Sequence, residues 1–130
     1  MGRGGTPISV LVVEDEVLIS NLVADVLSAS GFVVHEVTTA DEALRYLGSG
    51  ADIDILFTDI NLPGDMNGAE LAARARELRP EMPIVYASGR YKLSDISPLV
   101  PRSLFMAKPY DPNDVCALLT RLTATGESLA

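Results

Sequence analysis

The sequence has 130 residues, of which 48% are hydrophobic and 22% are charged, as is typical of a single globular domain. Its formal net charge of −8 argues against a nucleic-acid partner, which would require a basic face. No apolar run approaches the ~18 residues of a membrane span, and the single cysteine, Cys116, cannot form an internal disulfide. We therefore expect a cytoplasmic protein with no nucleic-acid or membrane partner.

Short apolar runs alternate with segments of helical period, which is the pattern of a doubly wound α/β domain. The third run is apolar up to Asp59, so we expect a strand that is buried on both faces of a parallel sheet. The predicted strands are Ile8–Val13, Phe32–Val37, Ile53–Thr58, Ile84–Ala87 and Leu104–Ala107.

Four clear helical segments follow the first, second, third and fifth strands. Gly31 is expected to cap the end of the first helix, and Thr39 and Asp111 to begin the second and the last. Gly68–Leu78 carries the third helix, which Pro80 ends. The apolar stripe of the first helix is expected to consist of Ile19, Leu22, Val23 and Val26.

The segment between the fourth and fifth strands is less regular. Pro98 and Pro101 leave room for little more than a helix over Lys92–Leu99. Since proline in a helix interior costs ~3 kcal/mol, this helix is expected to be short or irregular. The predicted fold is a five-stranded parallel sheet, (βα)5, over residues 8–124, with a disordered leader at 1–7 and a frayed tail at 125–130.

Side chains that can bind ligands or take part in catalysis follow four of the five predicted strands. Glu14 and Asp15 come after the first strand, Asp59 after the third, Ser88 after the fourth and Lys108 after the fifth. Each has an ordinary explanation when taken alone, as a helix-dipole partner, a turn residue or a solvated lysine. Open α/β sheets bind ligands at the carboxyl edge of their strands, however, so the joint placement predicts a site there.

The residue types at this edge indicate metal-assisted phosphoryl chemistry. The carboxylates of Glu14, Asp15 and Asp59 would repel one another, and a hard divalent cation with oxygen ligands relieves that repulsion. Magnesium suits such a site because it is held by one or two carboxylates, waters and a phosphate. The Ser88 hydroxyl and the Lys108 ammonium suit phosphoryl oxygens.

With these motifs, the chain resembles the receiver domain of two-component response regulators over residues 8–124. The resemblance implies a flavodoxin-like fold in which Asp59 is the phosphoacceptor. Glu14 and Asp15 resemble the acidic pair that binds Mg²⁺ together with Asp59, and the backbone carbonyl of Asn61 is expected to complete that set.

The resemblance also assigns roles around the acceptor. Ser88 matches the hydroxyl switch position and Phe105 the aromatic switch position, while Lys108 pairs with the phosphoryl group. Pro109 is expected to follow a cis peptide bond. Two positions, Asn61 and Arg90, are expected to tune hydrolysis of the phosphoryl group.

A receiver of this kind takes its phosphoryl group from a phosphohistidine of a histidine kinase or histidine phosphotransferase, forming an acyl phosphate. It is a signalling domain and not an enzyme, since it promotes only its own phosphorylation and dephosphorylation. The change of charge would then shift the population between two packings of the domain and so signal to a downstream protein.

Two departures from the common family pattern stand out. The loop from Leu62 to Gly68 is one residue longer, and Tyr86–Tyr91 is similar to the Phe-Ala-Thr-Gly-Tyr motif of a subgroup of single-domain receivers. That subgroup has a reduced fourth helix, which disfavours the usual dimer and leads us to expect a monomer. A stand-alone receiver is expected because no output domain follows Leu122, although a receiver cut from a hybrid kinase would look the same.

Three other classes of protein have to be distinguished from a receiver. A haloacid-dehalogenase-type phosphatase would carry an acid two residues after the nucleophile, where this chain has Asn61. An FMN carrier would need a hydroxyl-rich loop after the first strand, where this chain has Glu14 and Asp15. A pseudo-receiver would lack part of the set that Asp59, Ser88 and Lys108 complete here.

Overall fold

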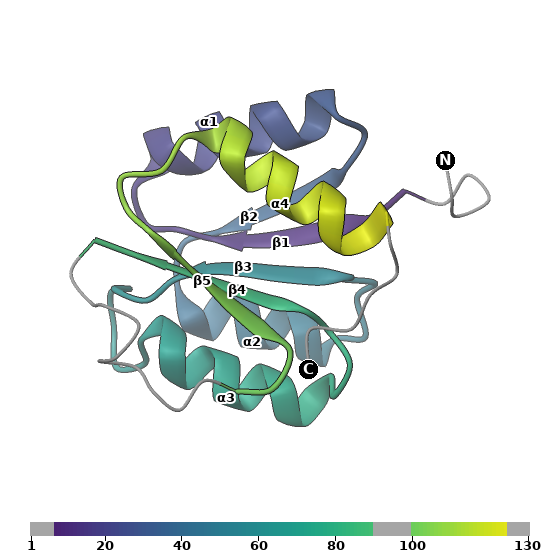
Figure 1. Ribbon diagram of the computed structural model, residues 1–130. Coiled ribbons are helices and arrows are strands. Elements are labelled where there is room, and N and C mark those ends of the chain that lie inside the picture. Colours follow the sequence, from purple (N-terminus) through teal and green to yellow (C-terminus); the bar gives the residue numbers. More distant parts are fainter. Residues whose placement is uncertain (1–6, 90–99, 125–130) are drawn as a thin grey trace.

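The computed structural model describes residues 7–89 and 100–124, which form one parallel sheet between two helical layers (Figure 1). The five strands lie in the order β2-β1-β3-β4-β5. They are β1 (Ser9–Val13), β2 (Val33–Val37), β3 (Ile55–Asp59), β4 (Ile84–Ser88) and β5 (Ser103–Ala107). The helices are α1 (Val17–Ala29), α2 (Ala40–Gly48), α3 (Gly68–Leu78) and α4 (Pro112–Ala124).

The predicted doubly wound architecture is confirmed. Helices α1 and α4 lie side by side on one face of the sheet, and α2 and α3 cover the other (Figure 1). The predicted helix at 92–99, residues 1–6 of the predicted leader and the predicted tail at 125–130 lie outside the described residues. Within the described ranges, none of the helices has the length and apolarity needed to cross a bilayer.

The third strand begins two residues later than the sequence predicts. The N–H of Asp54 donates to the Ser9 carbonyl at 2.8 Å, and the Asp54 carboxylate accepts the Ser9 N–H at 2.8 Å. The Asp54 carboxylate thus accepts the Ser9 N–H, which a backbone carbonyl of the neighbouring strand would otherwise accept. The pairing of β3 with β1 therefore starts at Ile55. The strand also includes Asp59, and β4 likewise includes Ser88, so both side chains sit on the last residue of a strand.

Strands β3 and β4 are buried along their whole length, which explains why their sequences are apolar without alternation. Alternate residues of β3 enter different cores. Ile55 and Phe57 pack in the layer under α1 and α4, whereas Leu56 packs in the layer under α2 and α3. Asp59 continues the first of these two series, so its side chain belongs to the α1 and α4 side.

The apolar stripe of α1 is rotated from the predicted one. Leu22 is 57% exposed, and Ser20, which the pattern leaves out, is buried. The Ser20 hydroxyl donates to the Glu36 carboxylate at 2.7 Å, so its burial leaves no unpaired donor. The buried residues of α1 are Ser20, Val23, Ala24 and Leu27.

The predicted helix ends are confirmed. Gly31 has a φ of +98°, and the next N–H, that of Phe32, donates to the Leu27 carbonyl in a Schellman motif at the end of α1. The Thr39 hydroxyl accepts the N–H three residues further on at the start of α2. The Asp111 carboxylate accepts the N–H two residues further on at the start of α4.

Helix α3 begins in close contact with the backbone at the end of β3. The N–H of Gly68 donates to the Ile60 carbonyl at 2.8 Å. A β-carbon at Gly68 would collide with the carbonyl oxygen of Asp59. Only glycine therefore allows the first turn of α3 to lie this close to the strand end that carries Asp59.

Gly68→Ala should therefore destabilise the fold. The added methyl group forces a shift of the strand end or of α3, so we expect a loss of about 1–3 kcal/mol in the free energy of unfolding. Gly48→Ala is the matched control, because Gly48 is an exposed residue of α2 with open space around it. It should leave stability unchanged or raise it by up to about 1 kcal/mol. Urea unfolding measures both, and equal midpoints for Gly68→Ala and the parent protein would contradict the contact.

Candidate functional site

The carboxyl ends of four parallel strands bring the predicted site residues to one edge of the sheet. Glu14 directly follows β1, Lys108 directly follows β5, and Asp59 and Ser88 are the last residues of β3 and β4. Because β3 lies between β1 and β4, Asp59 is the central group. The site thus follows from the strand order, as expected for an open α/β sheet.

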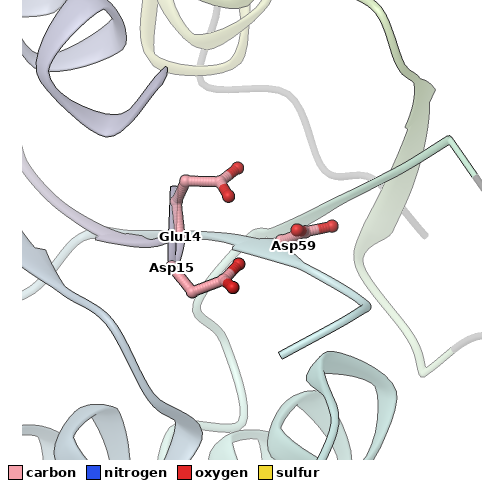
Figure 2. A group of neighbouring side chains, drawn as sticks. All are labelled: Glu14, Asp15 and Asp59. Carbon is pink, nitrogen blue, oxygen red and sulfur yellow. The ribbon is translucent and has the colours of Figure 1, made fainter. Parts of the chain in front are cut away.

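Three carboxylates form a cluster at this edge (Figure 2). One oxygen each of Glu14, Asp15 and Asp59 lies within 4.8 Å of the other two. Glu14 is only 2% exposed and Asp59 only 6%, whereas Asp15 is exposed. Buried carboxylates at this range repel one another, so the arrangement needs a cation.

Lys108 supplies one cation from the protein itself. Its Nζ donates to Oε1 of Glu14 at 2.9 Å and to Oδ2 of Asp59 at 3.2 Å. The Lys108 N–H donates to the Ser88 carbonyl at 3.0 Å, and the Lys108–Pro109 peptide bond is cis. One ammonium group therefore joins the carboxylates that follow β1 and end β3.

Burial dominates the ionisation of the two inner carboxyls. It raises the pKa of Asp59, and the ammonium of Lys108 and the backbone N–H of Asn61 only partly offset this effect. Burial likewise raises the pKa of Glu14 despite its bond to Lys108. For Lys108, burial lowers the pKa, but bonds and charges from Glu14 and Asp59 more than reverse this, so it stays above its ordinary value.

Of the remaining predicted site residues, the structure describes Ser88, Asn61 and Phe105. Ser88 is 1% exposed, and its neighbour Ala87 lies opposite Asp59 in the strand register. The backbone N–H of Asn61 lies close enough to lower the pKa of Asp59. Phe105 is half-buried and packs on the α2 and α3 side of the sheet. Arg90 lies outside the described residues.

The structure also places Tyr110, a residue not among the predicted site residues, within electrostatic range of the charged cluster. Its half-buried ring meets Phe57 edge-on, with the centroids 5.7 Å apart. Burial, and then the charge of Glu14, raises the pKa of Tyr110 to about 12, so its hydroxyl is neutral at physiological pH. Its position two residues after Lys108 places it near the predicted site, but no pattern in the sequence indicates its contact with Phe57.

Two further residues lie apart from the cluster. His35, in β2, has its Nδ1 3.0 Å from the hydroxyl of Tyr46. Cys116 is half-buried on α4. It donates to the Ser30 hydroxyl at 3.1 Å, at the end of α1.

The raised pKa of Asp59 predicts a dependence of stability on pH. The folded state binds this proton more tightly than the unfolded chain, so the free energy of unfolding should fall as pH rises from the ordinary value of 3.8 through the raised pKa. Asp59→Asn removes this dependence. We expect the variant to be more stable than the parent protein at about pH 7 and this advantage to shrink toward about pH 4. Urea unfolding over that range measures the stability of both proteins. The same dependence on pH in the parent protein and in Asp59→Asn would contradict the raised pKa of Asp59.

A flavodoxin-like sheet with three carboxylates and one lysine at its carboxyl edge is typical of receiver domains, and it places this protein in that class. The family described as the response regulator receiver domain matches residues 10–120, and the chain belongs to this family. Receiver domains are signalling domains of two-component systems, and they interact with histidine kinases or phosphotransferases. The phosphatase and FMN-carrier alternatives are thereby excluded.

Several known proteins are similar to this chain. Two-component response regulator ORR11 of Oryza sativa subsp. indica is 32% identical over 123 residues, covering 92% of this chain and 83% of that protein. Aerobic respiration control protein ArcA of Escherichia coli (strain K12) is 32% identical over 108 residues, covering 82% of this chain but 44% of that protein. A crystal structure of a response regulator receiver protein from Sinorhizobium medicae WSM419 matches with a TM-score of 0.85 and 33% identity, covering 93% of this chain and 98% of that one.

Proposed function

We propose that Asp59 is the phosphoacceptor of this receiver and takes its phosphoryl group from a phosphohistidine of a partner kinase or phosphotransferase. The observation that carries this proposal is the bridge from Lys108 to Asp59 and Glu14 at the central strand end. A nearly buried carboxylate with an ammonium at 3.2 Å has a cation placed to balance charge on an incoming phosphoryl group.

The transfer is an in-line displacement at phosphorus. An oxygen of Asp59 forms the new bond to phosphorus, while the bond to the histidine nitrogen breaks and that nitrogen keeps the electron pair. The product is an acyl phosphate on Asp59. The Lys108 ammonium now donates to both Glu14 and Asp59. After the transfer it would pair with a phosphoryl oxygen instead.

The carboxylate cluster suits Mg²⁺. Glu14, Asp15 and Asp59 offer three oxygens close together, and the backbone carbonyl of Asn61 would add a fourth. When bound, the ion neutralises charge on the phosphoryl oxygens. The chain's own residues would hold this ion and orient the acceptor, and burial keeps water away from Asp59.

The response to phosphorylation would run through β4 and β5. The Ser88 hydroxyl would hydrogen-bond the phosphoryl group, and Phe105 would turn inward behind it. In support, Ser88 ends β4 beside Asp59, and Phe105 is half-buried opposite Tyr86 in the strand register. Asn61 and Arg90 would tune the rate at which the acyl phosphate is hydrolysed.

The partner docking surface would include the start of α1. Val17, Leu18 and Leu22 are 57%, 80% and 57% exposed, and they belong to α1, which begins two residues after Asp15. An exposed apolar patch beside a phosphoacceptor suits a protein donor, because the donor must place its histidine at Asp59. We propose a cytoplasmic monomer that signals by docking to a downstream protein.

Phosphorylation by acetyl phosphate tests the proposed acceptor. With Mg²⁺ present, the intact mass should increase by one phosphoryl group in the parent protein and stay unchanged in Asp59→Asn. Asp65→Asn is the matched control, because Asp65 is an exposed carboxylate in the loop after β3, and this variant should be phosphorylated like the parent. Without Mg²⁺ the adduct should be lost in every protein.

An adduct that persists in Asp59→Asn would overturn the assignment. If no adduct forms in the parent protein, beryllofluoride distinguishes rapid hydrolysis from an inactive receiver. A Mg²⁺-dependent spectral change with beryllofluoride would support the acceptor site, and its absence would favour the pseudo-receiver.

A further inference from the structure

Lys108 must span a long distance to reach its partners. It follows β5, at the far side of β4 from Asp59, and Glu14 follows β1, one strand further still. Neighbouring strands lie about 4.8 Å apart, so Asp59 is about two strand spacings from β5 and Glu14 about three. The side chains of Lys108, Asp59 and Glu14 meet by extending toward one another across the sheet edge. The chain also moves across that edge after β5, since Tyr110 contacts Phe57 of β3.

Tyr110 shows where this crossing leads. Two residues after Lys108, its ring packs edge-on against Phe57 of β3, with a centroid distance of 5.7 Å. The ring is half-buried in the core layer under α1 and α4. Phe57 precedes Asp59 by two residues on the same face of β3, so the contact lies directly below the acceptor.

The backbone of Lys108 is thus held on both sides. On one side its N–H donates to the Ser88 carbonyl at the end of β4. On the other, the ring of Tyr110 fixes the chain to β3 through Phe57. Between these two anchors the ammonium group reaches Glu14 and Asp59, and the side chain is only 18% exposed.

We infer that Tyr110 is a positioning residue for phosphoryl transfer, which holds Lys108 over the acceptor through the contact of its ring with Phe57. This inference rests on the proposed function of Asp59. The ring carries the effect, because an edge-on aromatic pair needs no hydroxyl. The hydroxyl lies within electrostatic range of the charges of Glu14, Lys108, Asp59 and Glu16.

The test is a double-mutant cycle in the rate of phosphorylation by acetyl phosphate with Mg²⁺. Tyr110→Phe keeps the ring and should stay within about twofold of the parent protein. Tyr110→Ala and Tyr110→Leu lose the ring and should slow the reaction about tenfold or more, since misplacing a reacting group by 1 Å can cost about 100-fold. Leucine retains apolar volume against Phe57, so that variant keeps the test valid if alanine unfolds the domain.

The same three substitutions are then made in a Lys108→Ala background. If Tyr110 acts through Lys108, none of them should change the residual rate by more than about twofold. Equal losses in both backgrounds, or a normal rate for Tyr110→Leu, would overturn the inference. A failure of the proposed function would look different, because the parent protein itself would then gain no phosphoryl group.

Discussion

The site depends on one shared cation, the ammonium group of Lys108 between Glu14 and Asp59. Two nearly buried carboxylates from neighbouring strands could not remain ionised beside each other without it. The sheet order places their strands next to each other and leaves the lysine on the edge strand, so the chain has to bring the lysine across. The cis bond, the strand pairing of Lys108 and the ring of Tyr110 all lie within this short crossing segment.

The central strand joins this site to both cores. The residues of β3 alternate between the two helical layers, and its last residue is the proposed acceptor. Helix α3 rests on the backbone of that same residue because Gly68 has no side chain. Tyr110 rests on the other side of the strand, against Phe57. Packing that stabilises the fold therefore also fixes Asp59 from two directions.

Most of the fold and the central part of the site could be predicted from the sequence. Apolar periodicity located the five strands, and residues at strand ends met as parallel topology requires. The start of β3 could not be predicted, since Asp54 replaces a ladder bond with a side-chain bond. The exposure of Leu22 depends on how α1 is rotated against its neighbours, and the contact of Tyr110 with Phe57 joins segments far apart in sequence. Neither leaves a local pattern in the chain.

The cluster of three carboxylates and one lysine has a consequence for the order of events at the site. When all four groups are ionised, the edge carries two net negative charges. Any phosphoryl donor is itself an anion, so without a bound cation this edge would repel it. A divalent cation would cancel this charge. Under the function proposed for Asp59, phosphorylation would therefore be sensitive to the free cation concentration and to ionic strength before any contact with the donor is made.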